Sequence, residues 1–292
     1  MLKLQIMMSL GFSPCPNDTF IFYALANKRI GTKGLDFNPL IEDVETLNQL
    51  AMKRAIDVTK ISCHAFYYLQ EDYHFLRAGG AFGRGCGPLL VQESGVGSQR
   101  SEIKKIAIPG ELTTAFLLLK LYLASTPPPI THHPSLSFVV MPFYEIMEAV
   151  RDGKVDAGLI IHESRFTYQD YGLTQIIDLG DWWEKETGLP IPLGGIIAKK
   201  SLGLPTIKTI ESLIRASVEY SMLHRKDAMP FIKKYSQELS DDVIFKHISL
   251  YVNDYTIDMG DNGEAALNEL LKRAKGVPKK SMTFWGGNGE KL

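Results

Sequence analysis

The sequence predicts an α/β protein with two lobes and a cleft between them. Short apolar runs alternate with segments of helical periodicity, which is typical of strand–helix units around largely parallel sheets. The chain has 292 residues, and a domain usually takes about 100–200, so two domains are expected. We expect residues 1–93 and 197–292 to form a larger, discontinuous lobe and residues 94–196 a smaller one, because a polar stretch begins near residue 93.

The N-terminal region is predicted to contain three strands and two helices. An apolar run predicts a strand over 4–12, and a turn with two prolines then leads into a helix over about 18–27. Helical spacing of apolar residues predicts the next helix over 44–51. A short predicted strand over 58–61 and a longer one over 87–92 complete this region.

The middle and C-terminal regions continue the alternation. The predicted strands are 106–108, 157–161 and 193–198, and a loop rich in proline and histidine is expected over 126–134. The predicted helices, from the spacing of their apolar residues, are 113–124, 143–153, 208–225, 227–236, 240–252 and 262–275.

Composition argues against several classes of function. The 32 basic and 33 acidic residues are interspersed, so no basic stripe for nucleic acid is expected. No apolar stretch approaches the roughly 20 residues that span a bilayer. The three cysteines, Cys15, Cys63 and Cys86, form no Cys-x-x-Cys pair, which indicates free thiols in the cytoplasm rather than disulfides or a zinc site. We expect no metal and no organic cofactor, because the sequence offers no set of ligands for either. The adjacent His132 and His133 would point apart.

The first candidate site is the turn Ser-Pro-Cys-Pro-Asn-Asp at residues 13–18. Asn17 or Asp18 can cap the following helix, and free N–H groups there favour an anionic group of a ligand. A purely structural cap is the alternative interpretation. Cys15 is a weaker candidate for a nucleophile, because no neighbouring base is evident.

Two further segments carry hydroxyl groups at the ends of predicted strands. Gly110, Thr113 and Thr114 open a helix, where hydroxyls and N–H groups offer hydrogen-bond donors, although an ordinary threonine cap explains them equally well. Lys60 and Ser62 lie where another strand ends, the edge at which ligands gather in open α/β sheets.

His162 is the strongest candidate for a catalytic residue. The apolar strand over 157–161 places it at the C-terminal edge of a sheet, and a neutral imidazole can accept a proton near pH 7. Glu163 or a nearby hydroxyl could tune its basicity. The alternative is a structural histidine at a strand end.

Taken together and in this order, the segments resemble the 1,4-dihydroxy-6-naphthoate synthase family. The matching strings are GFSPCPNDTFIFYAL (11–25), LIEDVETLN (40–48), GGAFGRGCGPLLV (79–91), AGLIIHESRFTY (157–168), TGLPIPLGG (187–195) and YVNDYTIDMG (251–260). They cover nearly the whole chain except about the last fifteen residues.

The resemblance implies a fold like the type 2 periplasmic binding proteins, with mixed sheets, flanking helices and an interlobe cleft. It implies a carbon–carbon lyase of menaquinone biosynthesis by the futalosine route. This enzyme cleaves cyclic dehypoxanthine futalosine to 1,4-dihydroxy-6-naphthoate and a three-carbon fragment.

The resemblance also implies roles for individual residues. His162 corresponds to the family's proposed base, and the family's substrate-contact segments fall on Lys60-Ile61-Ser62 and Thr113-Thr114-Ala115. One departure is Glu111-Leu112, where a more basic or polar pair is expected, since an acidic residue beside an anionic substrate is unfavourable.

Two rival functions share the predicted fold. A solute-binding protein of a transporter is disfavoured by the absence of an export signal and by three unpaired cysteines. A chorismate dehydratase of the same route should lack the Pro-Cys-Pro-Asn-Asp turn. The expected partner is a small molecule, with neither nucleic acid nor membrane involved, and the sequence leaves monomer and dimer open.

Overall fold

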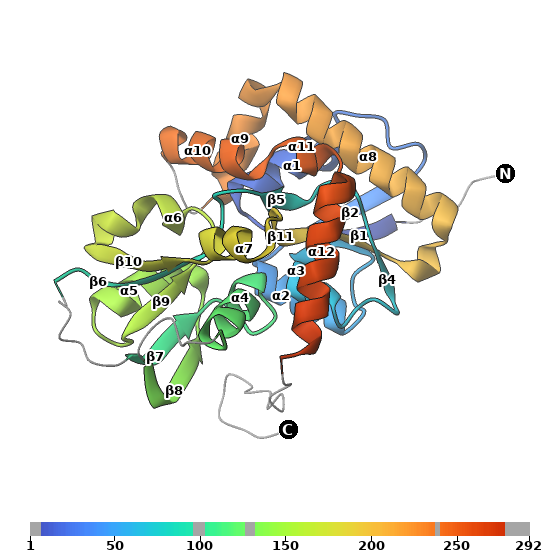
Figure 1. The fold of residues 1–292 in the computed structure, drawn as a ribbon. Helices are drawn as coiled ribbons and strands as arrows, with labels where there is room; N and C mark the ends of the chain where they lie inside the picture. The colour runs from blue at the N-terminus through green and yellow to red at the C-terminus, as the bar shows by residue number, and fades with distance from the viewer. Residues whose placement is uncertain (1–6, 96–102, 126–131, 237–239, 278–292) are drawn as a thin grey trace, which may run out of the picture.

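The computed structural model describes residues 7–95, 103–125, 132–236 and 240–277. Within these ranges the strands form two sheets, which lie side by side with helices packed around each (Figure 1). Both sheets contain parallel and antiparallel pairs. The predicted α/β class with mixed sheets is therefore confirmed.

The first sheet has the strand order β2-β1-β3-β11-β4, and β5 also pairs with β11. Strand β1 runs parallel to β2 and β3, whereas β11 returns antiparallel to β3, β4 and β5. The strands are β1 (Met7–Phe12), β2 (Asp36–Ile41), β3 (Val58–Ser62), β4 (Tyr73–Phe75), β5 (Ala81–Gly83) and β11 (Ile191–Lys199).

Helix α1 (Pro16–Ala26) is the core helix of this half of the molecule. Every residue from Pro16 to Leu25 is buried, which suits a helix that is apolar on all sides from Phe20 onward. It packs against α8 (Leu204–Leu223), α9 (Arg225–Tyr235) and α10 (Asp241–Tyr251). Its first turn, with Pro16 at the first helical position, is thereby held at the end of β1.

The remaining helices of this half surround the sheet. Among them, α12 crosses the front of the molecule in Figure 1 and packs against α3 and β11. They are α2 (Val44–Met52), α3 (Cys63–Phe66), the 3₁₀ turn η3 (Lys200–Leu202), α11 (Asp254–Ile257) and α12 (Gly260–Lys275).

The second sheet has the order β10-β6-β9-β7-β8. Its central strand β9 is parallel to β7, antiparallel to β6 and fully buried. The strands are β6 (Leu89–Glu93), β7 (Ile103–Ile108), β8 (His132–Val140), β9 (Ala157–Ile160) and β10 (Leu173–Asp178). The helices are α4 (Thr114–Leu123), η1 (Phe143–Glu145), α5 (Ile146–Arg151), α6 (Ser164–Thr167), η2 (Tyr168–Tyr171) and α7 (Leu179–Thr187).

The chain passes between the two sheets twice. It enters the second sheet between β5 and β6 and returns between α7 and β11. Strand β6 belongs to the second sheet and β11 to the first, so the sheets exchange the chain near residues 88 and 190. The predicted lobe boundaries at residues 93 and 196 remain a prediction. They divide the chain after β6, which belongs to the second sheet, and within β11, which belongs to the first.

Some elements differ from the sequence-based expectation. The loop expected over 126–134 is replaced from His132 onward by β8, whose partly buried Leu136 and Phe138 pack on the second core, and residues 126–131 lie outside the described ranges. Strands β2, β4, β5 and β10 and helix α7 were not predicted. No helix in the described ranges is long and apolar enough to cross a bilayer.

Candidate functional site

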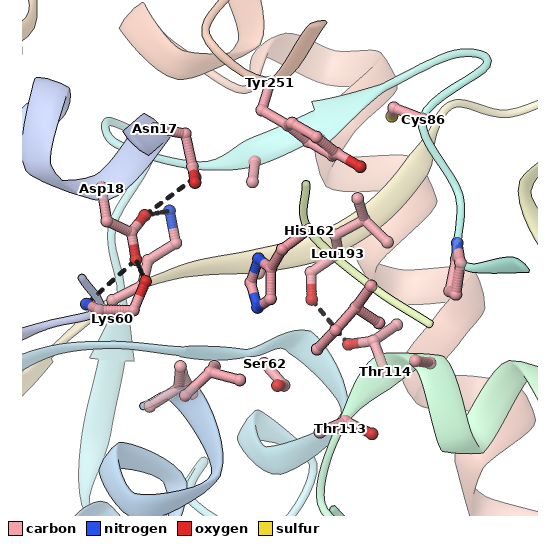
Figure 2. A pocket seen from close by; sticks show the side chains of 18 of the residues that line it. Asn17, Asp18, Lys60, Ser62, Cys86, Thr113, Thr114, His162, Leu193 and Tyr251 are labelled. Atoms are coloured by element: carbon pink, nitrogen blue, oxygen red, sulfur yellow. Dashed lines mark hydrogen bonds and ion pairs between the residues drawn. The ribbon is translucent and has the colours of Figure 1, made fainter. Parts of the chain in front are cut away.

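A cavity of about 80 Å³ opens where the two halves of the molecule meet (Figure 2). Its walls come from the start of α1, the end of β3, the start of α4, the segment after β9, strand β11 and the end of α10. Nine residues proposed from the sequence line it: Asn17, Asp18, Lys60, Ile61, Ser62, Thr113, Thr114, Ala115 and His162. Gly110 and Cys15, which were also considered, are not among the lining residues.

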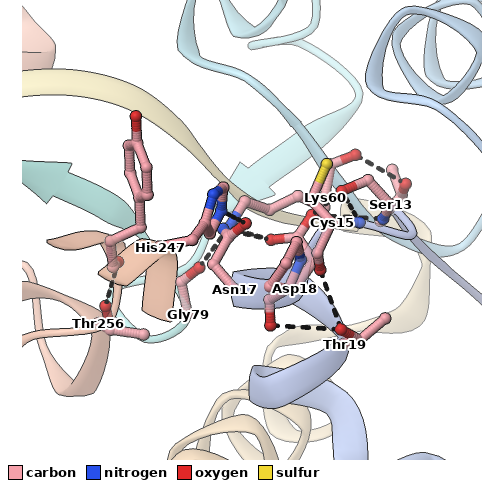
Figure 3. Close-up of polar contacts among 12 residues, drawn as sticks. Ser13, Cys15, Asn17, Asp18, Thr19, Lys60, Gly79, His247 and Thr256 are labelled. Atoms are coloured by element: carbon pink, nitrogen blue, oxygen red, sulfur yellow. Dashed lines mark hydrogen bonds and ion pairs between the residues drawn. The ribbon is translucent and has the colours of Figure 1, made fainter. Parts of the chain in front are cut away.

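A buried ion pair forms one end of the cavity. The Nζ of Lys60 lies 3.0 Å from Oδ1 of Asp18, and both side chains are about 5% exposed or less. Lys60 also donates to the carbonyl of Gly79 at 2.9 Å, while Oδ2 of Asp18 accepts from the hydroxyl and the N–H of Ser13 (Figure 3). The pair is thus hydrogen-bonded on both sides, as a buried pair must be to persist.

Asn17 links this pair to a second buried group. Its Nδ2 donates to Oδ1 of Asp18 at 3.0 Å, and its Oδ1 lies 2.9 Å from Nε2 of His247 on α10. Asn17 therefore acts as a connector within the wall rather than as a cap of α1, for which the structure shows no side-chain cap.

His162 projects into the cavity from the segment after β9, as Figure 2 shows. Its backbone has a positive φ of 57°, a left-handed conformation that is uncommon outside glycine and tends to persist at functional sites. Its ring packs at 5.0 Å from Phe143 and 6.4 Å from His247.

Burial and the nearby Lys60 lower the pKa of His162 to about 4, opposed by the carboxylates of Asp18 and Asp43. The imidazole is therefore neutral near pH 7 and has a lone pair available to accept a proton.

The hydroxyl of Ser62 keeps its proton available. Asn48 holds this residue from both sides, since its Oδ1 accepts from the Ser62 N–H at 2.9 Å and its Nδ2 donates to the Ser62 Oγ at 3.2 Å. In the described part of the chain, Ser62 Oγ has no acceptor for its own proton, so it can donate to an oxygen of a bound molecule.

The two threonines at the start of α4 serve the protein itself. Thr113 Oγ1 donates to the carbonyl of Gly110 and accepts from the Phe116 N–H, an ordinary helix cap. Thr114 Oγ1 donates to the carbonyl of Leu193 at 2.7 Å and accepts from the His64 N–H at 3.1 Å, which ties α4 to β11 and α3. What α4 offers a ligand is the N–H groups of Thr114 and Ala115 in its first turn, since the Phe116 N–H is taken by the Thr113 cap.

The turn before α4 shows why an acidic residue at position 111, unexpected beside an anionic substrate, is tolerated. The Glu111 side chain is exposed and does not line the cavity, so its charge points away from a bound anion. Leu112 is buried, and its N–H donates to Oε1 of Glu45 on α2 at 3.4 Å.

Cys15 is buried beside the ion pair and is poorly suited to be a nucleophile. Burial raises the pKa of its thiol well above the ordinary value, and the carboxylates of Glu163 and Asp18 add to this effect. The other two cysteines are also buried and unpaired. The described residues hold no cluster of three or more histidine, cysteine, aspartate or glutamate side chains that could bind a metal.

Two residues of α10 belong to the site without having been predicted. Tyr251 lines the cavity, and His247 lies behind it. Both come from a helix about 90 residues after His162, and its amphipathic pattern predicts only a packed helix. Neither has a local sequence signal that points to a site.

Comparison with known proteins gives a consistent result. Residues 8–276 match the family described as menaquinone biosynthesis. The chain is 44% identical to a 1,4-dihydroxy-6-naphthoate synthase of Thermus thermophilus, with 92% of this chain and 94% of that protein covered. It is 45% identical to a 1,4-dihydroxy-6-naphthoate synthase of Streptomyces coelicolor, with coverages of 91% and 92%.

Solved structures resemble the fold as a whole. A protein of Archaeoglobus fulgidus is 36% identical with a TM-score of 0.83, covering 92% of this chain and 97% of that one. The alkanesulfonate-binding protein SsuA of Xanthomonas axonopodis is only 13% identical with a TM-score of 0.66, covering 95% and 96%. This second likeness confirms the fold of periplasmic binding proteins and carries nothing about function.

Proposed function

Since this chain belongs to the menaquinone-biosynthesis family, and within it to the 1,4-dihydroxy-6-naphthoate synthases, we propose that it cleaves cyclic dehypoxanthine futalosine and releases a three-carbon fragment. The chain is an enzyme of the lyase class. The observation that best supports the proposed chemistry is a neutral His162 held in a strained turn at the centre of the cavity.

In this proposal His162 is the general base. Its neutral ring removes a proton from the sugar-derived part of the substrate, and the resulting imidazolium is stabilised by the carboxylates of Asp18 and Asp43. A retro-aldol-like step then breaks a carbon–carbon bond and expels the three-carbon fragment. Aromatisation of the naphthoate ring drives the reaction forward.

The other cavity residues orient the substrate. The proton of the Ser62 hydroxyl is available to an oxygen of the substrate. Thr114 and Ala115 line the cavity at the start of α4, where the N–H groups of a first helical turn suit a carboxylate. The Lys60–Asp18 pair closes the opposite end and adds a fixed dipole. Substrate contacts are thus proposed for both halves of the molecule, and closure around the substrate would exclude water.

The scheme needs no metal and no organic cofactor. We place the enzyme in the cytoplasm, which the three free cysteines support. Its expected partner is the small-molecule substrate.

The test is turnover of cyclic dehypoxanthine futalosine by the wild type and by His162→Ala, with naphthoate followed by chromatography. We expect product from the wild type and a loss of at least about 100-fold in kcat for the variant, the usual contribution of a general base. His74, outside the cavity, provides the matched control His74→Ala, which should keep wild-type activity. Tight binding without product in the wild type would overturn the proposal and indicate a binding protein.

A further inference from the structure

His247 lies one layer behind the cavity and has no place in the mechanism above. It is on α10, its exposed fraction is 0%, and it does not line the cavity itself. Its ring packs 4.6 Å from that of Tyr251, which does line the cavity, and is nearly parallel to that of His162 at 6.4 Å. A titratable ring in this position needs a physical explanation, because burying it without full hydrogen bonding is unfavourable.

The network around Asn17 determines which nitrogen of His247 carries the proton. Asn17 turns its NH₂ group toward the Asp18 carboxylate, so its oxygen faces Nε2 of His247 (Figure 3). Nε2 must therefore be the protonated nitrogen that donates this hydrogen bond. Burial and the neighbouring His162 hold the pKa of His247 well below its usual value, which leaves the ring neutral and Nδ1 as an acceptor.

That acceptor is directed at the segment that carries His162. Within the described residues Nδ1 of His247 has no hydrogen-bond partner, and Oε2 of Glu163 lies 3.9 Å away, beyond hydrogen-bond distance. Glu163 is itself buried and directly follows the left-handed backbone of His162. The two groups come from opposite halves of the molecule, α10 beside the first sheet and the end of β9 in the second.

We propose that His247 is a positioning residue: when substrate is bound, its Nδ1 and the Glu163 carboxyl share one proton in a hydrogen bond, and this bond fixes the turn that presents His162. The pair must take up one proton from the solvent as this bond forms, because a bare carboxylate and an imidazole lone pair repel each other. The movement needed is on the order of 1 Å, since a hydrogen bond of this type has a length of about 2.7–2.9 Å. This inference rests on the proposed role of His162 as base.

The experiment is a double-mutant cycle on steady-state turnover of cyclic dehypoxanthine futalosine. The amide of His247→Gln reaches the position of Nε2 and keeps the donor to Asn17, but it leaves nothing at Nδ1. Glu163→Ala removes the other partner. We expect each variant to lower kcat about 10- to 100-fold with little change in KM, because misplacing a reacting group by about 1 Å has effects of this size. The double variant should be no slower than the slower single variant.

A conservative variant separates positioning from structural support. The amide of Glu163→Gln supplies a permanent N–H to Nδ1, so this variant should keep kcat within about threefold of the wild type, unlike Glu163→Ala. If His247→Gln does not fold, as judged by its thermal midpoint, the comparison between the two Glu163 variants decides.

Additive losses in the cycle, or a Glu163→Gln variant as slow as Glu163→Ala, would overturn the inference. Wild type and His162→Ala are run in parallel. A wild type without product contradicts the proposed function itself. An active wild type and an inactive His162→Ala, together with additive losses in the cycle, would contradict only the role of His247.

Discussion

Two opposing demands meet at His162. A base in a closed site must be neutral before the reaction, which burial provides, and its conjugate acid must be tolerated afterwards, which Asp18 and Asp43 provide. Its left-handed backbone adds strain that the surrounding structure must hold in place. These features belong to one residue and can be tested on it.

The pH dependence of kcat/KM should report this base. Because the free-enzyme pKa of His162 is lowered to about 4, the neutral form persists above that pH, and kcat/KM should stay flat from pH 8 to 5. Below pH 4 it should fall about tenfold per pH unit as the ring becomes protonated. The measurement is initial rate at limiting substrate after brief exposure to each pH. An acid limb with a midpoint near the ordinary histidine value would contradict a buried base.

Removing one partner of the buried Lys60–Asp18 pair should destabilise the protein more than removing both. Lys60→Met leaves the Asp18 carboxylate buried without its counter-ion and should lower the free energy of unfolding by about 3–5 kcal/mol. Adding Asp18→Asn removes the unpaired charge and should recover part of that loss. Urea unfolding of the three proteins checks this, and a double variant less stable than Lys60→Met would be the contrary result.

The candidate residues could be found in the sequence where a strand end places them, and not otherwise. Lys60 and Ser62 lie in the C-terminal part of buried strand β3, and His162 follows buried strand β9, so the edge rule for α/β sheets brings them to one cavity. The helix cap made by Thr113 was the alternative stated from the sequence. The role of the Thr114 hydroxyl was not predictable, because its acceptor, the Leu193 carbonyl, lies 79 residues away. His247 was missed for the same reason: its partner Asn17 is 230 residues distant.

Among the elements, α2 connects the site to the opposite half of the molecule. Glu45 on this helix accepts hydrogen bonds from Asn48 and Gln49 on its own helix and from the Leu112 N–H across the interface. Gly110, with φ of 158°, approaches Glu45 so closely that an added Cβ would lie 2.5 Å from its carboxyl carbon. Asn48 in turn holds Ser62, so α2 couples this interface to a cavity hydroxyl.

Glu45→Gln should change stability in a pH-dependent manner. Burial raises the pKa of Glu45 to about 7, above the unfolded value of 4.5, so its contribution to stability is present at low pH and lost as the pH rises through 7. The neutral glutamine avoids that loss. Relative to wild type, the variant should therefore gain stability between pH 5 and pH 8, measured by urea unfolding at each pH. A difference that is constant with pH would show that Glu45 is already ionised in the fold.

Elements with a clear apolar run or a clear spacing of apolar residues were predicted from the sequence. Elements without either pattern were not. Strand β9 and helix α1 from Phe20 onward come from continuous apolar runs, and both elements and β3 are fully or almost fully buried. Strand β2 contains Pro39, is only half buried and lies at an edge of its sheet, where proline is tolerated and apolar alternation is weak. Its pairing with β1 depends on tertiary contacts that the local sequence does not encode.

At the scale of the whole molecule, three buried histidines determine the acid side of the stability profile. Burial lowers the pKa of His64 and His162 to about 4 and that of His247 well below its usual value. Between the unfolded value of 6.5 and these lower values the unfolded chain binds protons that the folded protein does not. Stability is therefore lost as the pH falls through this window.

The urea midpoint should accordingly drop from pH 7 to pH 5. Each histidine contributes up to about 1.4 kcal/mol per pH unit, and the opposing contribution of Glu45 is smaller than that of the three histidines together. His64→Gln, which lies outside the cavity lining, should make the profile shallower. A midpoint that is flat or rises toward pH 5 would contradict neutral histidines in the fold.

The position of β11 late in the chain determines when each sheet can be completed during synthesis. The second sheet is complete once residue 178 has been synthesised, because all its strands lie between 89 and 178. The first sheet still lacks β11 at that stage, so β3 has an open edge and β4 and β5 have no strand to join. The nascent chain thus carries a finished inserted half beside an unfinished N-terminal one. Until β11 has been synthesised, the exposed edge of β3 is the place where aggregation by strand pairing with another chain is most favoured, and where a chaperone would protect the nascent chain most.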